Sequence, residues 1–253
     1  MSPTIVATQG ELIVERDPSS RSGRLLRQGD MDASYVDLAD PSHLEFDYLR
    51  WMRIVLRVAR ARRVLHVGGG ACALPRALAS EDPDGRQEVC EADDTVLALA
   101  REHLGLRRAR GLRVRHAEGR DFISGQPEAS WDAIAVDAYV GAAVPPRLIT
   151  VEALTDAARV APVALVNVVD NRSARQVRTV AAGLAEAYPR VLTVGGRAGN
   201  TIVVGSALRL DLERIGAQVA ADRSPARVIA PRALARLVAG TPALRDEPGG
   251  SGG

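Results

Sequence analysis

The chain contains no lysine: all 33 of its Lys and Arg residues are arginines. A lysine Schiff base is therefore excluded, and any covalent catalysis would need another nucleophile. Aromatic residues make up only 3% of the chain, and none interleaves with its two arginine clusters. We interpret both clusters as solvated faces and expect no nucleic-acid partner. The clusters comprise Arg57, Arg60, Arg62 and Arg63, and Arg107, Arg108, Arg110, Arg113 and Arg115.

Cysteine is also scarce. Cys72 and Cys90 are the only two, too few for a disulfide framework or a metal site, so we expect no metal. No stretch approaches the ~20 apolar residues of a membrane span, and the N-terminus lacks a basic region followed by an apolar core. A net charge of +2 is too small to indicate a membrane surface. These absences predict a soluble, cytoplasmic protein with no membrane partner.

The length of 253 residues and 46% hydrophobic content suit one large globular domain with a small extension. Residues 1–42 are polar and turn-rich and predict a short N-terminal β extension. Its candidate strands are Glu11–Glu15, Gly23–Arg27 and Ser34–Leu38. Ser42 and Glu45 form a capping-box pattern that predicts a helix over 43–59.

From there to residue 206, strands alternate with helices, which predicts a Rossmann-like, mostly parallel sheet of seven strands with helices on both faces. The expected strands are 64–67, 87–91, 112–116, 133–137, 163–168, 190–194 and 200–205, and the expected helices are 71–80, 94–104, 151–160 and 172–187.

The last two strands are separated by only five residues, 195–199. A parallel pair needs a crossover of a dozen or more residues, so this pair must be antiparallel. The sequence therefore predicts an α/β fold with an antiparallel last strand, which is typical of class I S-adenosylmethionine-dependent transferases rather than nicotinamide dehydrogenases. Residues 207–246 predict two further helices, near 208–221 and 231–239, packed on the same domain, and 247–253 predict a disordered tail.

A glycine turn follows the first strand of this domain. Gly68, Gly69 and Gly70, with Ala73, fit the G-x-G-x-x-G/A pattern that brings backbone close to a nucleoside ligand. Glu91 ends the second strand about 20 residues later, where a carboxylate can accept both ribose hydroxyls. We take these three glycines, Glu91 and the adjoining Ala92 as candidate cofactor contacts; Asp93 or Asp94 is expected to cap the next helix.

Three further acids follow later strands. Glu118, with Gly119, follows the third strand and either contacts the adenine of the cofactor or belongs to a surface turn. Asp137 ends the fourth strand at the carboxyl edge, where open α/β sheets bind ligands, and is the leading candidate for a group that faces the transferred moiety or acts as a base. Asp170, after the fifth strand, is a weaker candidate with a structural role as the alternative.

Taken together, these residues resemble the spermidine synthase (polyamine aminopropyltransferase) family from about Ser34 to Gly205. Glu45–Tyr48 resembles the family's segment that ends in a substrate-pocket tyrosine, here Tyr48, and Val67–Gly70 resembles its glycine motif. Glu118–Arg120 resembles its adenine-contacting segment. Asp137–Tyr139 resembles the start of its catalytic loop, and the run into Pro145 and Leu148 also fits. The resemblance implies that Tyr48 and Asp137 face the acceptor, and it allows a homodimer, since the family associates partly through its N-terminal β region.

The sequence departs from the family where a polyamine would bind. Ala71 replaces an aspartate that holds the aminopropyl ammonium, and Val140 replaces the second catalytic-loop aspartate. Leu49-Arg50 replaces His-Glu, so that Arg50 would repel a cation, and Ala33 replaces a glutamine. Each lost charge-assisted bond forfeits roughly 1–3 kcal/mol. The space left by Ala71 favours a ligand that needs no ammonium partner there.

Three functions follow as hypotheses. The first is a transferase that binds S-adenosylmethionine or its decarboxylated form and moves a group, with methyl preferred, from the sulfonium to a small-molecule acceptor. The second is a genuine polyamine synthase that transfers aminopropyl to a diamine. The third is a catalytically silent nucleoside-binding pseudoenzyme, supported by the missing acids.

Overall fold

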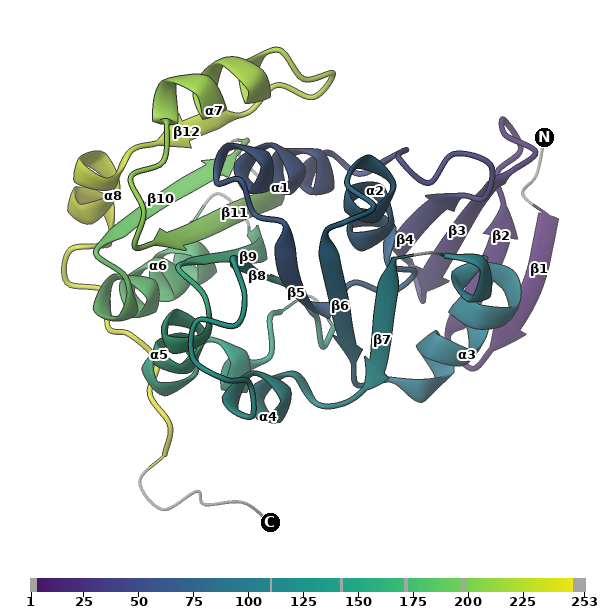
Figure 1. Cartoon of the computed structure of the whole chain (residues 1–253), viewed down its shortest axis with the longest axis horizontal. Coiled ribbons are helices and arrows are strands. Elements are labelled where there is room, and N and C mark those ends of the chain that lie inside the picture. Colours follow the sequence, from purple (N-terminus) through teal and green to yellow (C-terminus); the bar gives the residue numbers. More distant parts are fainter. Residues whose placement is uncertain (1–3, 110, 142, 171–172, 197–198, 248–253) are drawn as a thin grey trace.

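The computed structural model describes residues 4–109, 111–141, 143–170, 173–196 and 199–247. Its strands form two sheets (Figure 1). The N-terminal sheet is an antiparallel meander of four strands. They are β1 (Thr4–Gln9), β2 (Leu12–Arg16), β3 (Gly23–Gln28) and β4 (Met31–Asp37). The sequence predicted three of them and missed β1, because most of its residues are exposed and give no alternating apolar pattern.

The large sheet has the order β12-β10-β11-β9-β8-β5-β6-β7. Its strands are β5 (Arg63–Gly68), β6 (Arg86–Glu91), β7 (Leu112–His116), β8 (Ala133–Asp137), β9 (Val163–Asp170), β10 (Arg190–Gly195), β11 (Gly199–Ser206) and β12 (Arg227–Ile229). The predicted antiparallel last strand is confirmed: β11 lies antiparallel between β9 and β10. The predicted total of seven strands was one short, because the three-residue β12 pairs with β10.

Helices cover both faces of the large sheet, as predicted (Figure 1). They are α1 (Asp47–Val58), α2 (Ala73–Glu81), α3 (Asp94–His103), α4 (Gly119–Ser124), α5 (Val151–Val160), α6 (Arg175–Ala187), α7 (Leu212–Ala220) and α8 (Pro231–Val238). The core on one face includes α1, α2, α3 and α7, and the core on the other face includes α4, α5, α6 and α8. The six-residue α4 was not predicted, since it is too short to show a helical period.

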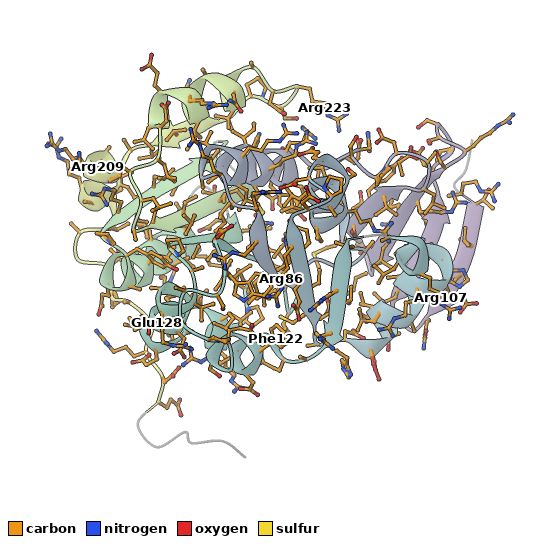
Figure 2. The ribbon with its side chains drawn as sticks, viewed as in Figure 1. Arg86, Arg107, Phe122, Glu128, Arg209 and Arg223 are labelled. Carbon is orange, nitrogen blue, oxygen red and sulfur yellow. The ribbon has the colours of Figure 1, made fainter. Side chains whose placement is uncertain are left out.

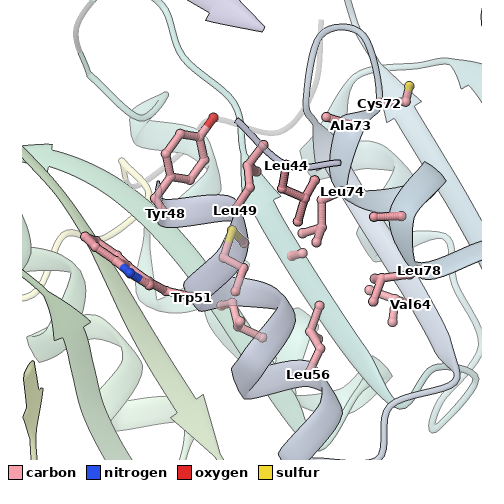
Figure 3. Packing of buried hydrophobic residues seen from close by; sticks show 14 of the residues in the cluster. Leu44, Tyr48, Leu49, Trp51, Leu56, Val64, Cys72, Ala73, Leu74 and Leu78 are labelled. Carbon is pink, nitrogen blue, oxygen red and sulfur yellow. The ribbon is translucent and has the colours of Figure 1, made fainter. Parts of the chain in front are cut away.

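The N-terminal sheet shares the core of the first face. Leu12 and Leu26 belong to the same buried cluster as the apolar side of α1. Figure 3 shows Leu49 and Leu56 of α1 on the side that faces Leu74 of α2. The small sheet is therefore packed against the large domain and is not a separate unit.

The predicted capping box at Ser42 is wrong. Helix α1 begins at Asp47, and its N-cap residue, Phe46, makes no side-chain cap. The Ser42 hydroxyl instead donates to Asp40 at 2.6 Å, and Glu45 accepts from Arg223 at 2.9 Å. Neither Ser42 nor Glu45 therefore caps α1.

The C-terminal region contains α7, β12 and α8, so the sequence predicted its two helices and missed its strand. Of the predicted disordered tail, residues 248–253 lie outside the described residues. So does the predicted helix start at residue 172; α6 begins at Arg175. Within the described ranges, no helix has the length and apolar character needed to cross a bilayer.

Candidate functional site

A cavity of about 1130 Å³ lies where the carboxyl ends of β5, β6 and β8 meet the N-terminal sheet. This is the edge at which open α/β sheets bind ligands. Every site residue predicted from the sequence lines the cavity, although the role of each stays a prediction. They are Tyr48, Gly68, Gly69, Gly70, Glu91, Ala92, Glu118, Gly119 and Asp137.

The glycine turn positions the ends of β5 and β8 against each other. All three glycines have positive φ angles, +75°, +108° and +53°, which glycine adopts readily. A Cβ atom on Gly68 would lie 2.6 Å from the carbonyl oxygen of Asp137, so any side chain there would push the two strands apart. A Cβ on Gly69 would meet no heavy atom within 4 Å, and Gly69 therefore exposes its backbone to the cavity.

Glu91 ends β6 beside this turn. Burial raises the pKa of Glu91, and the backbone N–H groups of Asp93, Ala92 and Gly70 oppose that rise. The Asp93 N–H donates to Glu91 Oε1 at 3.1 Å, while the Asp93 side chain caps α3 by accepting from the N–H of Thr95 at 2.8 Å. Of the two candidate caps, Asp93 and Asp94, it is therefore Asp93 that caps α3. Glu91 faces the cavity as a hydrogen-bond acceptor.

Glu118 lies at the start of α4, and the adenine contact expected of it stays a prediction. Its side chain caps α4 by accepting from the Asp121 N–H at 3.1 Å, and the residue also lines the cavity. Gly119 is required by packing, because a Cβ atom there would collide with the side chain of Val67. Glu118 lies two residues after the end of β7 (Leu112–His116).

Asp137 is held by two hydrogen bonds from elements far apart in sequence. The Tyr48 hydroxyl on α1 donates to Oδ2 at 3.0 Å, and Asn167 Nδ2 on β9 donates to Oδ1 at 3.0 Å. Burial raises the pKa of Asp137, and the two donors act in the opposite direction. Burial, followed by the charge of Asp137, also raises the pKa of Tyr48 well above its ordinary value, so the phenol stays a donor.

Sequence reasoning missed Asn167. It is 1% exposed and lines the cavity, and its backbone carbonyl oxygen accepts from the Tyr139 hydroxyl at 2.9 Å. The available signal was a single polar residue inside the apolar strand Val163–Val168. Asp170, the weaker candidate on the same strand, accepts from the Val177 N–H at 3.0 Å near the start of α6.

The departure at Ala71 has a different meaning from the one expected. Ala71 is fully buried, is absent from the cavity lining, and donates its N–H to Ser34 Oγ at 3.2 Å. The idea that its small side chain leaves ligand space is therefore wrong, because β4 covers that position. Val140, in contrast, is 74% exposed and lines the cavity without a charge.

The expected repulsion from Arg50 is also contradicted. Its guanidinium makes a bidentate contact with Asp222, at 3.0 and 3.1 Å, and donates to the carbonyl oxygens of Leu44 and Glu45. Arg50 does not belong to the cavity lining. The side chain instead binds the segment after α7 to the start of α1, with Trp51 Nε1 donating to the Ser224 carbonyl at 3.1 Å.

The cavity is strongly acidic. Among the described residues that line it, there is no arginine and there are eight carboxylates. They are Asp32, Glu45, Asp47, Glu91, Asp93, Asp94, Glu118 and Asp137. Asp32 and Glu45 pair with Arg27 and Arg223, which lie outside the lining. Figure 2 shows Arg107, Arg209 and Arg223 at the periphery of the molecule. Within the described ranges, no three His, Cys, Asp or Glu side chains are grouped as a metal site requires.

No protein-family model matches the chain. It is 28% identical over 125 residues to the polyamine aminopropyltransferase of Vibrio vulnificus (strain CMCP6). That match covers 48% of this chain and 42% of the relative, so the chain matches less than half of the relative's length. A crystal structure of a probable spermidine synthase from Corynebacterium glutamicum ATCC 13032 superposes with a TM-score of 0.87 at 25% identity, over 97% of both chains.

Human methyltransferase-like protein 13 in complex with SAH superposes with a TM-score of 0.58 at 21% identity, over 79% of this chain and 96% of that one, and so shares the fold. The sheet order, the antiparallel β11 and these superpositions define the class I S-adenosylmethionine-dependent transferase fold. Within that class, the chain is similar to spermidine synthases in sequence and in structure.

Proposed function

We propose that this protein is a transferase that binds S-adenosylmethionine or its decarboxylated form and moves a group from the sulfonium to a small-molecule nucleophile. One observation carries the proposal: a single acidic cavity joins the glycine turn and Glu91, suited to a nucleoside, to the hydrogen-bonded Asp137, suited to a nucleophile. The SAH complex of a protein with the same fold supports the nucleoside half.

The bound sulfonium would supply an electrophilic carbon. A nucleophile beside Asp137 forms a bond to that carbon while the carbon–sulfur bond breaks, and the electron pair stays on sulfur as a neutral thioether. Asp137 takes the proton that the nucleophile loses, and Tyr48 holds Oδ2 throughout because its phenol stays protonated. Burial raises the pKa of Asp137, which makes it a better proton acceptor than an exposed aspartate.

Different observations favour the two candidate groups. Methyl transfer is favoured by Val140, which lines the cavity without the carboxylate expected for a polyamine synthase. Aminopropyl transfer is favoured by the acidic lining, since intact S-adenosylmethionine carries a carboxylate for which the described lining offers no arginine. Asp47, beside Tyr48, makes no ion pair with any described residue and is available to a cationic acceptor.

Calorimetry of the full chain with S-adenosylmethionine, decarboxylated S-adenosylmethionine and S-adenosylhomocysteine tests the proposal. We expect at least one to bind with a dissociation constant well below 1 mM; no heat of binding from any of them at millimolar concentration would contradict it. The affinity for S-adenosylmethionine relative to that for its decarboxylated form distinguishes methyl transfer from aminopropyl transfer. Formation of spermidine from putrescine and the decarboxylated cofactor would establish aminopropyl transfer.

A further inference from the structure

The side chain of Asn167 makes an unusual, one-sided set of hydrogen bonds. Nδ2 donates to Asp137 Oδ1, while Oδ1 of the same amide is buried and accepts from no described residue. Its neighbours on β9, Val166 and Val168, are fully buried apolar residues. A buried amide that serves packing alone normally has partners for both of its polar atoms, so the contact with Asp137 is the one that accounts for an asparagine here.

The strand register explains why the two side chains meet. Strands β8 and β9 are parallel, with Val136 opposite Val166, so the next residue of each strand is Asp137 and Asn167. Both lie at the carboxyl edge and both line the cavity. The amide orientation follows from charge: rotating it by a half-turn would place Oδ1 against a carboxylate oxygen, whereas Nδ2 stabilises the ionised form.

No cation among the described residues competes for this role. The titratable groups around Asp137 are Tyr48 and Asp47 on α1, Tyr139 after β8, and His66 on β5, which lines a small void together with Tyr48 and Asp137. Burial lowers the pKa of His66 to about 4, so that imidazole is neutral near pH 7. Asn167 and Tyr48 are thus the side-chain donors that stabilise the charge of Asp137.

We propose that Asn167 is a positioning residue that fixes the rotamer of Asp137 and keeps it ionised to receive the proton of the acceptor. Tyr48 and Asn167 each donate to a different carboxylate oxygen, so each oxygen can still accept a further hydrogen bond. The catalytic part of this inference rests on the proposed transferase function, whereas the effect of Asn167 on Asp137 exists without any ligand.

The test is a pH titration of Asp137 in the ligand-free full chain, labelled with ¹³C at the aspartate side-chain carboxyl carbon and followed by NMR. Asp137→Asn identifies the resonance by its loss. We expect Asn167→Ala to raise the apparent pKa of Asp137 by about 1–2 units, because one hydrogen bond to a charged group is removed. Asn167→Ser, whose hydroxyl is too short to reach Asp137, is a second variant expected to shift the pKa in the same direction.

Asn200→Ala is the matched control, since Asn200 lines the same cavity from β11, and the side-chain donors to Asp137 among the described residues are Tyr48 and Asn167. An unchanged Asp137 titration in both Asn167 variants would overturn the inference, as would an equal shift in Asn200→Ala. Calorimetry with S-adenosylhomocysteine on the same samples is independent: absence of binding to the wild type contradicts the proposed function, whereas the titration alone decides the role of Asn167.

Discussion

At the level of single residues, Glu91 and Asp137 are carboxylates whose burial opposes their charge. Backbone N–H groups offset that cost at Glu91, and side-chain donors offset it at Asp137. A cationic ligand would favour the ionised form of both. The same arrangement therefore links affinity for the ligand to the protonation of these two groups.

Glu91→Gln should weaken binding of S-adenosylhomocysteine about 10- to 100-fold, because a neutral amide accepts hydrogen bonds from ribose hydroxyls less strongly than a carboxylate. Calorimetry measures the change, and Glu128→Gln, on the exposed surface, is the control. Equal affinities for the Glu91 variant and the wild type would show that the sugar is not bound at this residue.

Affinity for S-adenosylmethionine should fall as the pH is lowered, and the fall should begin above the ordinary carboxyl range of about 3.9–4.3. The sign follows from the raised pKa values of Glu91 and Asp137: both lose their charge at a higher pH than exposed acids and then attract a sulfonium less. S-adenosylhomocysteine, a neutral thioether, is the comparison. Parallel pH profiles for the two ligands would contradict this electrostatic account.

At the scale of elements, the sequence predicted the strands and turns that have a local pattern along the chain. Buried strands, glycine turns and the five-residue connection before β11 each have a local signature. These signatures were enough to predict the large sheet and nine of the residues that line the cavity. The contact of Asn167 with Asp137 could not be predicted, because neither strand's sequence determines the register between β8 and β9. The environment of Arg50 was equally hidden, since Asp222 lies 172 residues away.

The Arg50–Asp222 pair should stabilise the contact between α1 and the segment after α7. Their side chains are 8% and 11% exposed, so Arg50→Met leaves a buried charge and should lower the free energy of unfolding by about 3–5 kcal/mol. Adding Asp222→Asn should recover part of the loss. Urea unfolding measures both effects.

Arg62→Met serves as the control, because Arg62 and Asp82 form a pair that is 59% and 37% exposed. An exposed pair of this kind contributes about 0–1 kcal/mol. If Arg50→Met lowered the free energy of unfolding no more than Arg62→Met does, the buried pair would not be holding the two segments together.

At the scale of the whole molecule, the cavity is shared between two sheets. Met31, Asp32 and Ala33 of the N-terminal meander line it opposite the glycine turn of the large sheet. A ligand in this position would contact both units at once. The meander is therefore part of the site and not an appendage.

Hydrogen–deuterium exchange should reveal this sharing. We expect S-adenosylhomocysteine to slow exchange in peptides that contain residues 28–34 as well as in peptides that contain the glycine turn, because the ligand covers both. Peptides from α8, which packs against β10 and α6, should not change. Protection of the glycine turn alone would indicate that the meander does not contact the ligand.

The lining, which has no arginine among the described residues, also bears on how a turnover would end. Before transfer, the bound sulfonium is attracted by a wall of negative potential; afterwards the sulfur is neutral and that attraction is gone. The neutral thioether should therefore dissociate faster from the cavity than the sulfonium does. Product inhibition should then be weak.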